Sequence, residues 1–154
     1  MIVGLVAASA CGATAGASSL PDLVLPNLDR GAAPLALSSL RGHAVALVYF
    51  EPDCTWCLRQ LQAFGEVSSE FGLTPVAVGI HGEARELRRW IDRVGPSYPR
   101  VIETPALSRA LGEVPATPFT FLVDRNGDVR GTIRGYEEPT RLRARLKALF
   151  GANV

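Results

Sequence analysis

Two cysteines separated by two residues are the side chains in this sequence best suited to do chemistry. They form the run Cys54-Thr55-Trp56-Cys57, directly after the apolar stretch 44–50. Where a buried strand gives way to a helix, this spacing places both sulfur atoms on the first helical turn, within bonding distance. The helix N-terminus favours a thiolate on the more exposed first cysteine, and the second can attack a mixed disulfide. The spacing therefore indicates reversible dithiol–disulfide exchange.

Other roles for the pair are weaker. Half of a zinc site would need a second Cys-x-x-Cys or a pair of histidines, and the sequence has neither. A static structural disulfide is an alternative in an oxidising compartment, although bridges of this spacing are usually reducible. We therefore predict a redox pair that needs no metal and no other cofactor.

Composition excludes several classes of protein. The chain has 154 residues, which is enough for one globular domain with a real core. A hydrophobic content of 47% with balanced charge argues against a disordered chain. The net charge of +1 provides no field to attract nucleic acid, and no apolar run is long enough for a multi-spanning membrane protein.

The N-terminal region resembles an export signal. Residues 1–21 contain no charged side chain, the stretch Ile2–Val6 is apolar, and every residue of Ala8–Ser19 is Ala, Gly, Ser, Thr or Cys. A short apolar segment followed by small residues is typical of a secretory leader, although the usual basic start is missing. We therefore interpret residues 1–19 as an export signal or as a lipoprotein leader and tether.

The third cysteine, Cys11, lies inside this leader. The run Ala8-Ser9-Ala10-Cys11 resembles a lipobox, with Ala8 in place of the usual Leu, so Cys11 is a candidate for lipidation. Cleavage by an ordinary signal peptidase, for example after Ala15 or Ala17, and retention of a short hydrophobic tail are the alternatives. The leading interpretations place the folded domain outside the cytoplasm, and lipidation would tether it to a membrane.

Residues 20–154 are predicted to fold as one α/β domain. The expected order is strand, helix, strand, helix, a hairpin and a closing helix, which gives a central mixed sheet with helices on both faces. The strands are predicted at residues 34–40, 44–50, 76–80, 98–103, 119–123 and 129–133. The helices are predicted at residues 55–71, 83–94, 105–111 and 139–150.

Two segments outside the cysteine motif support a family resemblance. The run Leu35–His43 resembles the lead-in x-L-x-x-L-[KR]-G-K, with His43 in place of Lys. The run Val114–Asp124 resembles V-x-x-[TLA]-P-x-T-F-L-[IV]-D. With the cysteine pair, these segments identify the chain as similar to the TlpA-like branch of the thioredoxin superfamily, which includes cytochrome c maturation thioredoxins. The resemblance implies a thioredoxin fold with an N-terminal extension.

The same resemblance implies a mechanism. The Thr117–Pro118 peptide bond should be cis and should lie against the cysteine pair, where an extended partner segment could bind. Cys54 would attack a partner disulfide, Cys57 would resolve the mixed disulfide, and Trp56 would form an apolar lid beside them. The resemblance favours reduction of disulfide-containing envelope proteins, with electrons from a membrane-linked donor in the periplasm or another extracytoplasmic space. The sequence itself does not determine the direction of exchange.

The sequence departs from the family pattern around the cysteines. Val48 stands where thioredoxins have a buried Asp, and Gln60 stands where relatives have a Glu. Glu51 or Asp53 could replace the missing acid through water, but we expect both to be exposed loop carboxylates. Asp53, next to Cys54, should slightly oppose the thiolate. These departures leave the reduction potential open.

Functions from other classes are alternatives. A thiol peroxidase of the related peroxiredoxin type would need Thr three residues before its reactive Cys, but Glu51 precedes Cys54 at that distance and Cys54 precedes Cys57. A copper-binding protein could use both cysteines with His81 as a third ligand. A binding module without redox turnover is a further alternative.

Overall fold

The computed structural model describes residues 19–94 and 98–151. Cys11 and all of the expected leader except Ser19 therefore lie outside the described residues. Within the part described, no helix is both long and apolar enough to cross a membrane.

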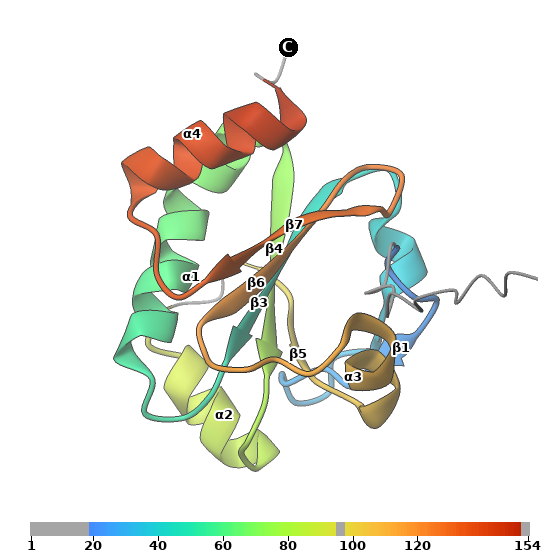
Figure 1. The fold of residues 1–154 in the computed structure, drawn as a ribbon. Helices are drawn as coiled ribbons and strands as arrows, with labels where there is room; N and C mark the ends of the chain where they lie inside the picture. The colour runs from blue at the N-terminus through green and yellow to red at the C-terminus, as the bar shows by residue number, and fades with distance from the viewer. Residues whose placement is uncertain (1–18, 95–97, 152–154) are drawn as a thin grey trace, which may run out of the picture.

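A five-stranded mixed sheet forms the centre of the molecule, with strand order β5-β4-β3-β6-β7 (Figure 1). β3, β4 and β5 are parallel to one another, whereas β6 is antiparallel to β3 and β7 is antiparallel to β6. The strands are β3 Ala44–Phe50, β4 Leu73–Gly79, β5 Arg100–Ile102, β6 Phe119–Val123 and β7 Val129–Arg134. The sheet is mixed, as the sequence predicts.

β3 is buried on both faces because every one of its seven residues is apolar. Its side chains alternate between two cores, as the period of a strand requires. Ala46, Val48 and Phe50 belong to one core, whereas Val45 and Tyr49 belong to the other. The central strand is therefore held from both sides, and it ends immediately before the cysteine motif.

Three helices cover the first face of the sheet, and the third of them closes the chain (Figure 1). They are α1 Thr55–Val67, α2 Ala84–Ile91 and α4 Pro139–Phe150. Each buries apolar side chains in the same core, for example Phe64 of α1, Leu87 of α2 and Leu146 of α4. A 3-10 turn, η2 at Ser68–Phe71, follows α1 and leads into β4.

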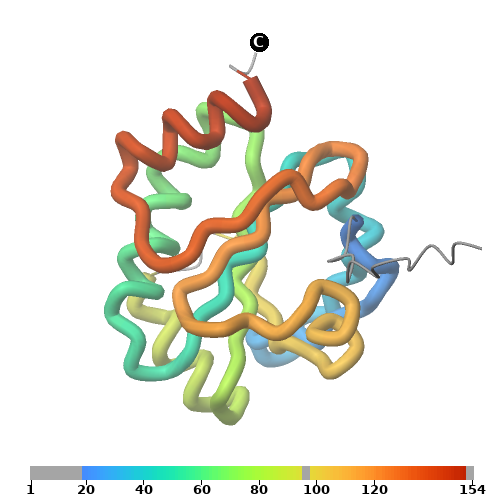
Figure 2. Tube along the Cα trace, in the orientation of Figure 1, coloured from blue at the N-terminus to red at the C-terminus, as the bar shows by residue number. Residues whose placement is uncertain are grey.

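The second face is covered by α3, Pro105–Leu111, together with the N-terminal segments, so helices lie on both faces as expected (Figure 2). The N-terminal elements are the short antiparallel strands β1 Val24–Leu25 and β2 Leu35–Ala36, followed by the 3-10 turn η1 at Leu37–Leu40. Leu25 and Leu37 are fully buried there. The N-terminal extension thus contributes to the core.

The predicted elements agree with the structure where a regular apolar pattern marked them. β3, α3, β6 and α4 have the predicted bounds. The strand predicted over 34–40 is wrong beyond Ala36, because residues 37–40 form η1. The helix predicted over 55–71 ends at Val67, and residues 68–71 form η2. Gly72, with a positive φ of 56°, ends this turn. The strand predicted over 76–80 begins earlier, at Leu73.

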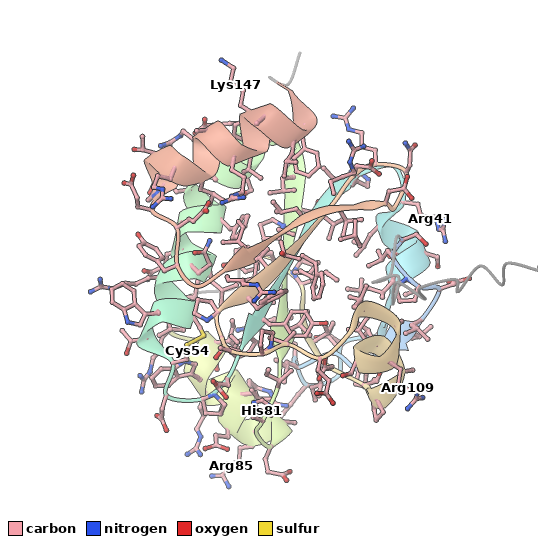
Figure 3. The ribbon with its side chains drawn as sticks, viewed as in Figure 1. Arg41, Cys54, His81, Arg85, Arg109 and Lys147 are labelled. Atoms are coloured by element: carbon pink, nitrogen blue, oxygen red, sulfur yellow. A yellow bond between two sulfur atoms is a disulfide. The ribbon has the colours of Figure 1, made fainter. Side chains whose placement is uncertain are left out.

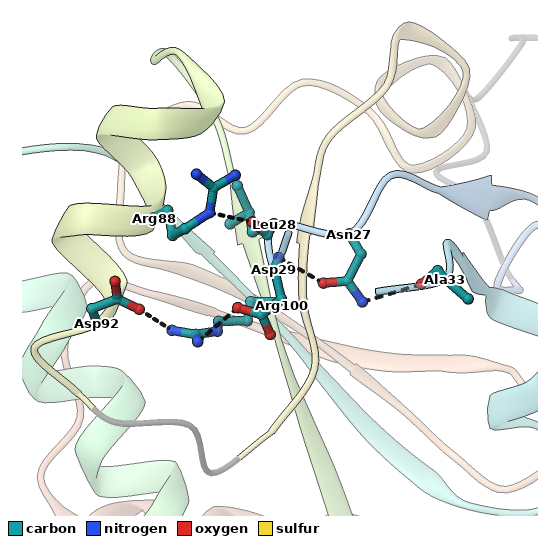
Figure 4. A network of polar contacts seen from close by, with 7 residues as sticks. All are labelled: Asn27, Leu28, Asp29, Ala33, Arg88, Asp92 and Arg100. Atoms are coloured by element: carbon teal, nitrogen blue, oxygen red, sulfur yellow. Dashed lines mark hydrogen bonds and ion pairs between the residues drawn. The ribbon is translucent and has the colours of Figure 1, made fainter. Parts of the chain in front are cut away.

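A buried arginine holds the N-terminal segment against β5 and α2 (Figure 4). The Arg100 side chain is 10% exposed, and its guanidinium contacts Asp29 and Asp92, each at 2.7 Å. Arg88 of α2 donates a hydrogen bond to the main-chain oxygen of Leu28. Main-chain bonds join the same segment to β5, with Leu28 N donating to Arg100 O at 2.8 Å. One cation therefore joins two carboxylates from separate segments.

Replacing this arginine should destabilise the fold. We expect Arg100→Ala to lower the free energy of unfolding by about 1–3 kcal/mol, because the buried guanidinium that joins Asp29 and Asp92 is lost together with its packing. The matched control is Arg130→Ala, because Arg130 is 52% exposed and pairs with Asp124 at the surface. Its loss should cost less than about 1 kcal/mol. Urea denaturation measures both, and equal losses would contradict the role of Arg100.

Candidate active site

Cys54 and Cys57 are joined by a disulfide at the N-terminal end of α1 (Figure 3). Their Cα atoms lie 5.3 Å apart, which the first helical turn permits. Cys57 is fully buried in the core between α1 and the sheet, whereas Cys54 is half-buried. A thiol or disulfide arriving from solvent therefore has access to Cys54.

The start of the helix places N–H groups against Cys54. Cys54 is the N-cap residue of α1, and its Sγ accepts a hydrogen bond from the N–H of Cys57 at 3.2 Å. Cys54 O accepts bonds from Cys57 N and Leu58 N. Unpaired N–H groups and the positive end of the helix dipole stabilise negative charge at this position. The helix therefore favours a thiolate on Cys54 once the disulfide is reduced.

A second loop meets the cysteines from far along the chain. The Thr117–Pro118 peptide bond is cis and immediately precedes β6. The antiparallel register pairs Tyr49 of β3 with Phe119 of β6, so the residues two steps beyond, Glu51 and Thr117, lie opposite one another. Thr117 Oγ1 is 3.8 Å from Cys54 Sγ. The pairing of two strands thus brings the cis-proline loop to the disulfide.

An aromatic pocket borders the same loop. Its lining residues are Trp56, Thr117, Pro118, Gly135 and Tyr136, and its volume is about 380 Å³. The rings of Trp56 and Tyr136 lie 5.5 Å apart, and Trp56 remains 54% exposed. Trp56, Thr117 and Pro118 therefore line one pocket beside the disulfide.

Glu51 departs from expectation. It is not a free loop carboxylate: its Oε1 accepts a hydrogen bond from Thr117 Oγ1 at 2.5 Å, and its Oε2 lies 3.0 Å from Nδ1 of His81. The Thr117 bond, supported by His81, holds the pKa of the Glu51 carboxyl below its usual range, although partial burial acts in the opposite direction. Asp53 is exposed as expected and adopts a positive φ of 61°. Glu51 therefore belongs to the site.

His81, considered above as a copper ligand, has a highly exposed side chain and contacts Glu51. Over residues 19–94 and 98–151, no group of three or more His, Cys, Asp or Glu side chains is placed to hold a metal ion. The polar contact described for His81 is therefore with the Glu51 carboxylate.

Behind the disulfide, positions 48 and 60, where the family resemblance implies an acid, hold a valine and a glutamine. Val48 is fully buried in the same core as Cys57. Gln60, one turn along α1 from Cys57, is also fully buried, and its Oε1 accepts a hydrogen bond from Glu137 N at 2.7 Å. Gln60 thus serves as a structural acceptor that ties α1 to the segment before α4.

Tyr136 and the bond between Glu51 and Thr117 belong to the site but were not predicted from the sequence. Tyr136 could have been found from the predicted hairpin, whereas the Glu51–Thr117 bond depends on the register of β3 and β6, which the tertiary structure decides. Phe119 of β6 pairs with Arg134 of β7, so two steps further Thr117 and Tyr136 lie opposite one another. The predicted hairpin of β6 and β7 is thus the sequence signal that pointed to Tyr136.

Known proteins share this fold and this sequence pattern. The Redoxin family model matches residues 14–149 of the chain. The thiol-disulfide oxidoreductase ResA of Geobacillus kaustophilus (strain HTA426) is 29% identical over 126 residues, which cover 80% of this chain and 71% of that protein. ResA of Geobacillus thermodenitrificans (strain NG80-2) is 28% identical over 141 residues, which cover 89% of this chain and 79% of that protein.

Solved structures agree on the fold. A thiol:disulfide interchange protein of the thioredoxin family from Chlorobium tepidum TLS superposes with a TM-score of 0.75 at 24% identity, over 90% of this chain and all of that one. A thiol-disulfide isomerase from Corynebacterium glutamicum gives 0.68 at 21% identity, over 89% and 98%. With its Cys54–Cys57 pair and thioredoxin fold, the chain belongs to the Redoxin family and is a TlpA-like thiol-disulfide oxidoreductase.

Proposed function

We propose that this protein reduces disulfide bonds of partner proteins outside the cytoplasm, with Cys54 as the attacking residue and Cys57 as the resolving residue. The unequal burial of the two sulfur-bearing residues supports this assignment. Cys54 is half-buried at a helix N-terminus, whereas Cys57 is fully buried behind it. An incoming disulfide therefore meets Cys54 first, and Cys57 is shielded from everything except Cys54.

The exchange proceeds in two balanced steps. The Cys54 thiolate attacks one sulfur of the partner disulfide, which breaks the partner bond, forms a mixed disulfide and releases the other partner sulfur as a thiolate that takes up a proton. Cys57 then loses its proton and attacks Cys54 Sγ, so the Cys54–Cys57 bond forms and the second partner sulfur leaves and is protonated. The partner gains two electrons, and the cysteine pair is oxidised.

The partner segment would bind beside the cis-proline loop. Trp56 and Tyr136 present exposed aromatic surface next to Thr117 and Pro118. Exposed aromatic side chains around a pocket are suited to hold apolar side chains of a partner, while an extended backbone lies along the loop. Binding by apolar and backbone contacts agrees with the chain's net charge of +1.

The location and electron supply rest on the leader and on the family resemblance. We assign residues 1–19 to export, with Cys11 as the candidate lipid attachment site, and residues 20–154 to the oxidoreductase domain. A membrane-linked donor would return the cysteine pair to its reduced form after each exchange, and disulfide-containing envelope proteins would be the substrates. Fractionation of cells that express the full chain, with and without Cys11→Ser, checks the assignment.

The order of attack can be tested by trapping. In a Cys11→Ser background, reduced Cys57→Ser should form a stable mixed disulfide through Cys54 with an extended peptide that carries an internal disulfide, because the resolving thiol is missing. The matched Cys54→Ser variant should form at least ten-fold less adduct, since Cys57 is buried. Intact mass measures both adducts. If Cys54→Ser formed more adduct than Cys57→Ser, Cys57 would be the attacking residue and Cys54 the resolving residue.

The aromatic pocket can be tested in the same assay. We expect Trp56→Ala to slow adduct formation with the peptide by about 3- to 10-fold, because it removes partner contacts worth about 1 kcal/mol. Its reaction with a small disulfide such as oxidised glutathione should change less than two-fold. Val24→Ala removes a similarly exposed apolar side chain on β1 and should leave both rates unchanged. Equal slowing of the two disulfides by Trp56→Ala would contradict a partner-binding pocket.

The direction of exchange follows from the reduction potential. Equilibration of the purified protein with glutathione should give a potential of about −230 mV or lower, in the range of proteins that act as reductants. A potential near −120 mV, typical of a disulfide-forming oxidant, would reverse the proposed direction.

A further inference from the structure

Glu51 is connected to the attacking sulfur through one hydroxyl group. Its Oε1 accepts a hydrogen bond from Thr117 Oγ1 at 2.5 Å, and the same hydroxyl lies 3.8 Å from Cys54 Sγ. The second carboxylate oxygen lies 3.0 Å from His81 Nδ1. Carboxylate, hydroxyl and sulfur therefore form a continuous line of contacts that ends on Cys54.

The Thr117 hydroxyl has a single proton to donate. An ionised carboxylate is a stronger acceptor than a sulfur atom, so the proton is directed to Glu51. Cys54 then faces the lone pairs of the hydroxyl oxygen. These lone pairs can accept a hydrogen bond from a thiol, but they offer no donor to a thiolate. The arrangement thus stabilises the protonated form of Cys54.

We infer that Glu51, acting through Thr117, holds Cys54 in its thiol form and opposes the stabilisation of the thiolate by the N-terminus of α1. This inference rests on the proposed function, in which Cys54 is the attacking residue. Glu51 is a positioning residue, because the group that contacts Cys54 Sγ is the Thr117 hydroxyl. The negative charge of the carboxylate acts in the same direction as the hydroxyl orientation, since a nearby anion disfavours a thiolate.

This effect of Glu51 on Cys54 changes the reduction potential of the Cys54–Cys57 pair. Stabilising the thiolate of an attacking cysteine stabilises the reduced protein and makes it a stronger oxidant. By opposing the thiolate, Glu51 moves the pair toward the reducing side. Because the pKa of Glu51 is held below its usual range, the carboxylate stays ionised at neutral and mildly acidic pH. This effect therefore persists until the pH falls below the ordinary range of a glutamate.

The other charged side chains that the structure describes near Cys54 do not contact the Thr117 hydroxyl as Glu51 does. Asp53 precedes Cys54 directly, but it is exposed and lines a pocket with Glu86, Arg89 and Arg93 of the α2 region. The guanidinium of Arg59, on α1, lies 4.8 Å from the Trp56 ring centre.

On the far side of Glu51, His81 shares a pocket with Glu103 and Glu113. The His81 imidazole contacts the second oxygen of the Glu51 carboxylate, so its removal should leave that carboxylate less satisfied and act in the opposite direction to removal of Glu51.

The test measures the pKa of Cys54 in reduced protein with Cys11→Ser, from the pH dependence of its alkylation by iodoacetamide. We expect Glu51→Gln to lower this pKa by about 0.5–1 unit, because it removes the charge and allows the Thr117 proton to turn toward Cys54. The matched control is Asp53→Asn, which removes the same charge one residue from Cys54, and Asn tolerates the positive φ there. Its shift should be less than half as large. An unchanged or raised pKa in Glu51→Gln, or an equal shift in Asp53→Asn, would overturn the inference.

Two further variants test whether Glu51 acts on Cys54 through Thr117. His81→Asn keeps a residue suited to the positive φ of 54° but removes the imidazole, and it should raise the pKa of Cys54 slightly. Thr117→Val is nearly isosteric, and in this background Glu51→Gln should shift the pKa of Cys54 by less than half as much. Thr117→Val should also return the pKa of Glu51 toward its ordinary value, as followed by carbon NMR. If Glu51→Gln shifted the pKa of Cys54 just as much in the Thr117→Val background, Thr117 would be excluded as the connecting residue.

The two proposals can fail separately. The pKa of Cys54 is a property of the free reduced protein, so it can respond to Glu51 even if no partner disulfide is trapped. Conversely, normal trapping through Cys54 with an unchanged pKa in Glu51→Gln would leave the proposed function intact and remove the role of Glu51.

Discussion

The antiparallel pairing of β3 with β6 is the constraint on which the site depends. β3 ends where the cysteine loop begins, and β6 begins where the cis-proline loop ends. Their register places Tyr49 opposite Phe119, and this alignment continues beyond the strands to place Glu51 opposite Thr117. The two different cores packed against β3 keep that register, because a slip by one residue would move every side chain of β3 into the other core.

Two opposing influences meet at Cys54. The N-terminus of α1 provides the N–H of Cys57 to the sulfur and favours the thiolate, whereas the Thr117 hydroxyl, engaged by Glu51, favours the thiol. Neither influence acts on Cys57 in the same way, because Cys57 is buried in apolar surroundings without an acid at position 48 or 60. The site thus separates a tunable outer cysteine from a shielded inner one.

The predictions agree with the structure where a segment carries its own local pattern, and they fail where the structure depends on contacts between distant segments. β3, α3, β6 and α4 were predicted with their bounds because each has a regular apolar pattern or a proline at its start. The 3-10 turns η1 and η2 were not predicted because the four residues of each carry too little pattern to separate them from a strand or a longer helix. Glu51 was expected in solvent because a carboxylate in a loop usually lies there, and its partners Thr117 and His81 come from other loops.

The sequence by itself determined the cysteine pair, the strand and helix that position it, and the resemblance that marks Thr117 and Pro118. These features are local, because a helical turn brings residues 54 and 57 together whatever the rest of the chain does. Only the tertiary structure decided that Glu51 bonds to Thr117, that the Tyr136 ring lies beside Trp56, and that Cys57 is fully buried in the core between α1 and the sheet. Those contacts depend on strand register and on the packing of α1 against the sheet, which no short stretch of sequence encodes.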